Sequence, residues 1–186
     1  MENIFFDLSQ LKHLGEGALI GKTVRIREPE KVSIGKGTII DDFTYISGDV
    51  EIGCYSHIAP NCTLSCGAGK LYIGNFVGIS SGSCIYVSST DYVRATLDLP
   101  SVPRDLKFGG EFADVSISDF VLLGSHSVVL PGSILPVGFA TTAQTVVRPR
   151  QFEEWTLYGG FECKLIHRRD SRELSSMKDR LLELCD

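Results

Sequence analysis

The sequence predicts an all-β protein, a parallel β-helix built from six-residue repeats. An aliphatic residue recurs at every sixth position over most of the chain, and in the first half glycine or another small residue usually follows it. This period matches neither the 3.6-residue turn of an α-helix nor the two-residue alternation of a simple strand. Six-residue units in which a short strand and a tight turn repeat build a triangular coil from three such units. The aliphatic side chain points into the coil, and the small residue after it lets the backbone turn the corner.

The repeat assigns residues 19–147 to the coil and places one residue of each unit in its interior. The last coil is the least regular, because a threonine takes an interior position there. The predicted interior residues are Ile20, Ile26, Ile34, Ile40, Ile46, Ile52, Ile58, Leu64, Ile73, Ile79, Ile85, Ile117, Leu123, Val129, Leu135, Thr141 and Val147.

Three segments lie outside the repeat. Residues 1–18 carry apolar side chains at roughly helical spacing, and we expect them to cap the first coil, whose open end exposes unpaired edges. Residues 87–115 interrupt the repeat and predict an excursion loop, a kind of loop that is usually functional. Residues 148–186 predict a tail and a C-terminal α-helix. Its apolar face is expected to pack on the coil or on a neighbour, and it carries Leu174, Met177, Leu181 and Leu184.

The composition argues against several classes of protein. A net charge of −5 argues against a general nucleic-acid binder. No apolar run approaches the roughly 20 residues that a membrane-spanning helix needs, and the first residues lack the features of a signal peptide. Of six cysteines, Cys62 and Cys66 form a lone C-x3-C without a second pair at metal spacing. We therefore expect free thiols, no metal and a cytoplasmic location.

Two motifs in the last coils carry a family resemblance. Leu123-Gly124-Ser125-His126 and Leu130-Pro131-Gly132 closely resemble the signature of hexapeptide-repeat acyltransferases. The wider resemblance covers about 52–185 and is similar to the surface-polysaccharide branch, the galactoside-type or O-antigen sugar acetyltransferases. It implies a left-handed β-helix, a homotrimer, acetyl-CoA as donor and an active site shared between two subunits.

The resemblance also implies coenzyme-binding positions. Ser125 matches the small residue whose backbone approaches the thiol end of the coenzyme, and Ala143 the residue that contacts the pantetheine arm. Arg148 and Lys164 match cations near the nucleotide end, where phosphates must be neutralised. Alternatively, the first two are plain turn residues and the last two solvated surface charges. Phe161 stands where the family has proline.

Acyl transfer also needs a base that takes the acceptor's proton. Galactoside acetyltransferases carry a histidine for this in the excursion loop, and residues 87–115 contain none. Asp91 is the acidic residue at that position. It would serve as base only if burial raised its pKa from the reference value of about 4, or it could bind the protonated amine of an amino sugar. The alternative is a loop-capping aspartate.

Two histidines in the coil are the other candidates for the base. His57 precedes Ile58, so it should point outward, one coil before the loop. His126 occupies a turn and should share a column along the coil edge with Asn61, Gly82 and Gln144. Its simpler interpretation is a turn residue, and we prefer His57.

Three functions remain open. The first is acetyl transfer to the amine of a nucleotide-linked amino sugar for surface polysaccharide or lipopolysaccharide O-antigen synthesis. The second is O-acetylation of a sugar hydroxyl, and the third is a non-catalytic solenoid that binds a partner. A deprotonated amine is a far better nucleophile than a hydroxyl, so a loop without histidine favours the amine.

Overall fold

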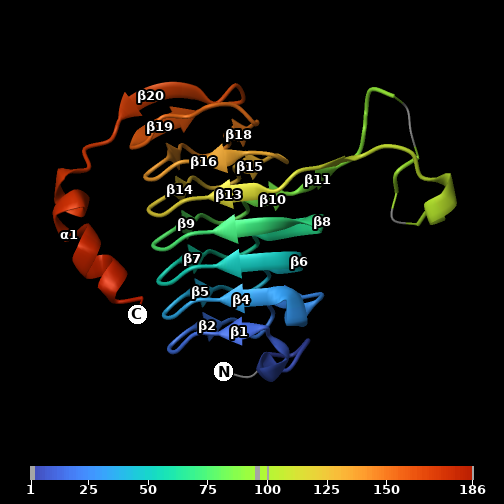
Figure 1. Cartoon of the computed structure of the whole chain (residues 1–186), viewed down its shortest axis with the longest axis horizontal. Coiled ribbons are helices and arrows are strands. Elements are labelled where there is room, and N and C mark those ends of the chain that lie inside the picture. Colours follow the sequence, from blue (N-terminus) through green and yellow to red (C-terminus); the bar gives the residue numbers. More distant parts are fainter. Residues whose placement is uncertain (1–2, 95–96, 100, 186) are drawn as a thin grey trace.

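The computed structural model describes residues 3–94, 97–99 and 101–185, and they form a triangular β-helix (Figure 1). Coils stack from the N-terminal end upward, one loop projects from the side, and the C-terminal helix runs back down the stack (Figure 1). Parallel pairing joins every coil to the next, as for Ile39 with His57 and His57 with Gly78. The all-β fold predicted from the repeat is confirmed.

Three faces of the coil are made by two large sheets. Strands β6 and β8 each bend around a corner and therefore pair on two faces, which joins those faces into one sheet. This sheet comprises β1 (His13–Leu14), β3 (Arg25–Ile26), β4 (Val32–Ile34), β6 (Tyr45–Ile52), β8 (Thr63–Ile73), β10 (Cys84–Tyr86), β13 (Val115–Ile117), β15 (Val128–Val129), β16 (Ile134–Leu135) and β18 (Val146–Val147). The remaining face comprises β2 (Leu19–Ile20), β5 (Ile39–Ile40), β7 (His57–Ile58), β9 (Gly78–Ile79), β14 (Leu122–Leu123), β17 (Ala140–Thr141), β19 (Thr156–Gly159) and β20 (Lys164–Arg168).

The interior is the column of side chains that the repeat predicts. Every predicted interior position is buried, including the threonine of the irregular last coil. The Thr141 hydroxyl accepts a hydrogen bond from the Gly124 N–H at 2.9 Å and lies 3.1 Å from the Ser127 hydroxyl. A buried polar group is tolerated when it is hydrogen-bonded, which explains how threonine replaces an aliphatic residue here.

Aromatic rings line one corner of the coil, a feature that the repeat did not reveal. Tyr55, Phe76, Phe120 and Trp155 have positive φ between 49° and 61°, a region that residues other than glycine rarely adopt. Their rings stack from coil to coil, with successive centroids 5.6, 5.4 and 6.0 Å apart. Stacking of this kind stabilises the coil and offsets the backbone strain at the corner.

The N-terminal segment differs in part from the predicted cap. Its described residues contain one short 3-10 helix, η1 (Leu8–Gln10), whose first turn is capped by Asp7. The Asn3 amide donates to the carbonyls of Gly21 and Val24 at 3.0 and 2.8 Å, which ties the segment to the first coil. Strand β1 already pairs with β4, so the coil begins at residue 13 rather than 19.

The excursion loop leaves and rejoins the coil without disturbing its register. Beyond Tyr86 the chain forms β11 (Ser88–Ser89) and β12 (Glu111–Phe112), an antiparallel pair at the base of the loop, and farther out η3 (Arg104–Leu106). Strands β10 and β13, on either side of the loop, both pair with β8. Figure 1 shows η3 standing away from the coil.

The C-terminal region first extends the coil and then leaves it. Strand β19 pairs in parallel with β17, and β20 pairs antiparallel with β19. Helix α1 (Arg172–Glu183) follows. On its predicted apolar face Leu174 and Leu181 are half-buried, whereas Met177 and Leu184 remain 43% and 47% exposed, so this face is only partly covered. One more short 3-10 helix, η2 (Pro29–Lys31), lies near the other end of the coil, between β3 and β4.

The interior column should dominate stability. We expect Ile40→Ala to destabilise the protein by about 2–5 kcal/mol, because Ile40 is fully buried and its loss leaves a cavity. Ile39→Ala, the adjacent residue of the same strand and 37% exposed, is the matched control and should cost far less. Urea unfolding at equal protein concentration compares the two, and equal losses would contradict an interior column.

Candidate active site

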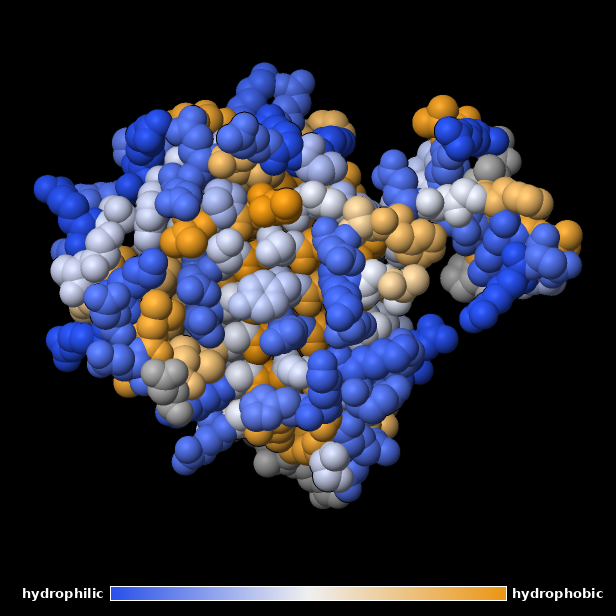
Figure 2. Space-filling model, in the orientation of Figure 1, coloured by the Kyte–Doolittle hydropathy of each residue, from blue (hydrophilic) through white to orange (hydrophobic). Residues whose placement is uncertain are grey.

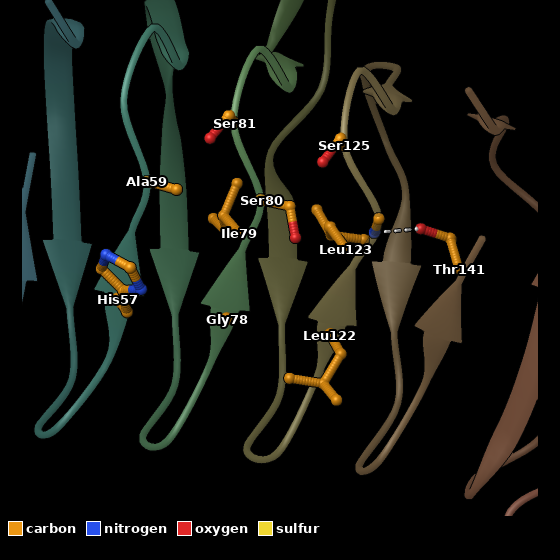
Figure 3. Close-up of a pocket in the computed structure, with 11 residues that line it drawn as sticks. His57, Ala59, Gly78, Ile79, Ser80, Ser81, Leu122, Leu123, Ser125 and Thr141 are labelled. Carbon is orange, nitrogen blue, oxygen red and sulfur yellow. Dashed lines mark hydrogen bonds between the residues drawn. The ribbon is translucent and has the colours of Figure 1, made fainter. Parts of the chain in front are cut away.

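A groove of about 460 Å³ runs along the face formed by β7, β9, β14 and β17. It is open because most of its lining residues are small, and Figure 3 shows them spread over successive coils. The floor contains Ala59, Gly78, Ser80, Ser81, Gly124 and Ser125. His57 and Leu122 form its longer side chains (Figure 3).

Gly78 keeps the middle of the groove open. It lies in register between His57 on β7 and Leu122 on β14. A Cβ atom at this position would come within 2.9 Å of the Leu122 Cδ2 atom. Any larger residue would therefore fill the space between the histidine and the leucine.

The structure places His57 at one end of this groove, pointing outward as predicted. Its Nε2 atom lies 2.7 Å from the Asp41 Oδ2 atom of the preceding coil, and both side chains are exposed to solvent. The sequence reasoning missed Asp41. A signal was available, because Ile40 and Ile58 are register partners, which sets Asp41 and His57 diagonally across neighbouring coils.

His126 lies at a corner, outside the residues that line the groove. The predicted column exists: Asn61, Gly82, His126 and Gln144 all have positive φ, between 57° and 73°, and follow one another from coil to coil. The His126 ring covers Gly82 so closely that a Cβ there would lie 2.4 Å from a ring atom. This geometry favours the interpretation of His126 as a turn residue.

Asp91 caps a turn in the loop. Its Oδ1 atom accepts hydrogen bonds from the Val93 and Arg94 N–H groups at 2.9 and 3.0 Å. These bonds, the one from Arg94 foremost, lower the pKa of the Asp91 carboxyl. A carboxylate held ionised in this way suits the binding of a cation better than the acceptance of a proton. Asp91 is not among the residues that line the groove of its own chain.

The predicted coenzyme residues lie along the last coils. Ser125 lines the groove, and Ala143 occupies the corresponding exposed position one coil farther on. The Arg148 guanidinium donates to the Phe161 carbonyl at 3.0 Å and lies over the Phe161 ring. Lys164 is mostly exposed and pairs with Glu162 at 2.6 Å.

A second arginine, which the sequence reasoning missed, joins this end of the coil. Arg148 and Arg150 share a pocket of about 260 Å³ with Glu162 and Cys163. Arg150 donates to the Cys163 carbonyl and lies over the Phe152 ring. The Arg148-Pro149-Arg150 sequence was the available signal, because two arginines leave the coil side by side.

Residues 3–94, 97–99 and 101–185 offer neither a metal site nor a membrane span of the following kinds. No cluster of three or more His, Cys, Asp or Glu side chains suited to a metal ion occurs there. In the same ranges, no helix is both long enough and apolar enough to span a membrane.

Known proteins share this fold over almost the whole chain. Residues 31–66 match the family described as bacterial transferase hexapeptide (six repeats). An alignment of 179 residues, which covers 91% of each chain, is 32% identical to a dTDP-4-amino-4,6-dideoxy-D-glucose acyltransferase of Escherichia coli.

Two solved structures extend the comparison. AntD, an N-acyltransferase from Bacillus cereus in complex with dTDP and 3-hydroxybutyryl-CoA, matches with a TM-score of 0.88 and 28% identity, covering 99% of this chain and 100% of that one. A maltose O-acetyltransferase from Clostridium difficile 630 shares the fold at a TM-score of 0.58 and 17% identity, covering 88% of this chain and 73% of that one.

The coil of six-residue repeats matches the left-handed β-helix of acyltransferases over almost its whole length. The alignment with the Escherichia coli enzyme, 32% identical over 91% of this chain, shows the family: this chain belongs to the hexapeptide-repeat acyltransferases. It is therefore an enzyme, and the alternative of a non-catalytic solenoid is wrong.

Proposed function

We propose that this protein transfers an acyl group from an acyl-coenzyme A to the amine of a dTDP-linked 4-amino-4,6-dideoxy sugar. The observation that carries the proposal is the nearly full-length match to enzymes of this kind, one by sequence and one by structure. The N-acyltransferase also superposes far better than the maltose O-acetyltransferase, which favours an amine over a hydroxyl acceptor.

The geometry supports a donor bound along the C-terminal coils. Ser125 lies in the groove, and Ala143 continues the same column, so a narrow pantetheine arm can lie against both. Arg148 and Arg150 stand farther along, where the phosphates of the coenzyme need positive charge, and Lys164 adds a third cation nearby. Acetyl-CoA and longer acyl-CoA thioesters share this binding chemistry.

Ser81 and Asp91 are proposed to hold the acceptor amine. AntD has been solved with coenzyme A after replacement of one serine or of one aspartate, two positions ten residues apart in its chain. Ser81 and Asp91 have the same separation here. Ser81 lines the groove, and the lowered pKa of Asp91 keeps a negative charge available for an ammonium group.

We further propose a homotrimer with the active site shared between subunits. Several apolar side chains are exposed on the projecting loop, where orange groups stand among blue ones at the right of Figure 2. Patches of this kind on a soluble protein usually mark interfaces. A second copy that meets the loop would bury these side chains and bring Asp91 to a neighbouring groove. The exposed apolar residues of the loop are Tyr92, Val93, Leu97, Leu99, Leu106, Phe108 and Phe112.

The setting that fits this chemistry is the cytoplasm. Cys54, Cys62, Cys66, Cys84 and Cys163 are free thiols, as expected in a reducing compartment. Burial raises the pKa of Cys66 to about 12, so this thiol is unreactive. The product would be an N-acylated nucleotide sugar that supplies surface polysaccharide or lipopolysaccharide synthesis.

The purified protein should release coenzyme A thiol when an acyl-CoA and dTDP-4-amino-4,6-dideoxyglucose are both present. A panel with acetyl-CoA and 3-hydroxybutyryl-CoA as donors identifies the acyl group. A matched dTDP sugar with hydroxyl in place of the amine is the control acceptor and should give no release. Faster turnover of the hydroxyl sugar would instead make the enzyme an O-acyltransferase.

Removal of the cations near the coenzyme phosphates should weaken donor binding. We expect Arg148→Ala and Lys164→Ala each to raise the Kd of the coenzyme about fivefold, which corresponds to a net contribution of about 1 kcal/mol per charge-assisted contact at a partly exposed site. Lys22→Ala, an exposed lysine of the first coil, is the control. Titration calorimetry measures the affinities, and unchanged values for both variants would contradict this placement.

The protein should sediment with the mass of three 20.4 kDa chains at micromolar concentration. Phe108→Asp places a charge on the apolar loop, and we expect it to shift the equilibrium toward monomers because the charge would have to be desolvated. Phe5→Asp, at an exposed phenylalanine of the N-terminal segment, should leave assembly unchanged. A monomeric parent protein would refute the trimer.

A further inference from the structure

The pair of Asp41 and His57 is a built feature of the groove that the comparisons do not assign. The two side chains come from neighbouring coils, and the Nε2 atom of His57 lies 2.7 Å from the Asp41 Oδ2 atom. An exposed ion pair contributes little to stability, so folding alone does not account for it. The register partners of His57 on the two neighbouring strands are Ile39 and Gly78, and neither has a polar side chain.

The contact with Asp41 decides which nitrogen of His57 is available. A carboxylate accepts hydrogen bonds and does not donate them, so Nε2 must carry the proton that faces Asp41. In the neutral ring Nδ1 is then unprotonated, and it has no hydrogen-bond partner within the described part of the chain. The ring stands at the end of the groove beside Gly78, where the missing side chain leaves Nδ1 access to a bound molecule (Figure 3).

The position along the groove suits the reacting atoms. His57 and Leu122 are two strands apart, roughly 10 Å at ordinary strand spacing. Ser125, in the column proposed for the pantetheine arm, lies on the coil of Leu122, three residues farther along the chain, so a thioester in this column would border the same groove into which the His57 ring opens (Figure 3). Ser81 is the neighbour of Ser125 on the preceding coil, and an acceptor amine held there would lie across the groove from the imidazole (Figure 3).

N-acylation requires a proton acceptor at this place. A sugar ammonium has no free electron pair until it loses a proton, and serine hydroxyls are too weakly basic to take it. Asp91, with its lowered pKa, is a better partner for the cation than a base. Among the groups that line the groove, the imidazole is the one suited to accept a proton.

We propose that His57 Nδ1 accepts the proton of the acceptor amine and that Asp41 is the positioning residue that holds His57 for this task. This inference rests on the proposed function. The freed amine attacks the thioester carbonyl carbon, so that a C–N bond forms in a tetrahedral intermediate. The C–S bond then breaks and its electron pair leaves with sulfur. The nitrogen, now positively charged, releases its surplus proton to solvent, and the proton held by His57 neutralises the thiolate, so that the products are the N-acyl sugar, the thiol of coenzyme A and one proton. Asp41 stabilises the transient imidazolium.

Steady-state kinetics with the dTDP amino sugar test the two roles. We expect His57→Ala to lower kcat by about 100-fold or more with little change in KM, and added imidazole to restore part of the lost turnover. Asp41→Asn should lower kcat by at least about 10-fold, because the imidazole can then adopt the unproductive tautomer. The double variant should be no slower than His57→Ala, since Asp41 acts only through His57.

His13→Ala, at an exposed histidine of β1, is the control and should keep parental turnover. Circular dichroism and sedimentation establish that each variant is folded and assembled. A His57→Ala protein with near-parental kcat overturns the base, and additive losses in the double variant overturn the positioning role. If the parent protein transfers no acyl group to any amino sugar, the proposed function fails and this inference falls with it.

Discussion

The structure depends on a match between two repeats along the coil axis, the pairing of each coil with the next and the spacing of the interior residues. Backbone hydrogen bonds fix each coil in register on the next, and the buried aliphatic column requires one interior residue in every six. When both conditions hold, every outward position also stacks into a straight column. The groove, the aromatic corner and the polar corner are three such columns. Function in this protein is therefore arranged along columns rather than around a central pocket.

The sequence predicts most of what this register determines. The interior residues and the polar corner through Gly82 and His126 were anticipated, because counting in sixes and in whole coils locates them. The aromatic corner was not predicted, because the aliphatic repeat does not indicate which residues, such as Tyr55 and Trp155, adopt positive φ. The role of Asp41 was not predicted, because its contact with His57 runs diagonally between coils. The direction in which a polar side chain points from the coil depends on its neighbours.

Charged groups lie in a fixed order along the coil axis, and this order fits the proposed acyl transfer. Cations gather at the C-terminal end around Arg148 and Arg150, small uncharged residues occupy the middle of the groove, and the His57–Asp41 pair lies toward the N-terminal end. The anionic Asp91 stands on the loop, outside its own groove. A polyanionic donor would thus be drawn to the cationic end, and the ammonium group of the acceptor toward Asp91.

The excursion loop has a consequence for how such enzymes diversify. Tyr86 pairs with Ser65 and Val115 pairs with Leu71, so the two ends of the loop are anchored on the same strand of the preceding coil. An inserted segment of different length or composition would leave every coil-to-coil pairing untouched. Recombination could therefore exchange the loop, and with it the proposed acceptor contacts, while the coils proposed to bind the donor stay unchanged. In such a scaffold, specificity for the acceptor can evolve without a change in the residues that bind the donor.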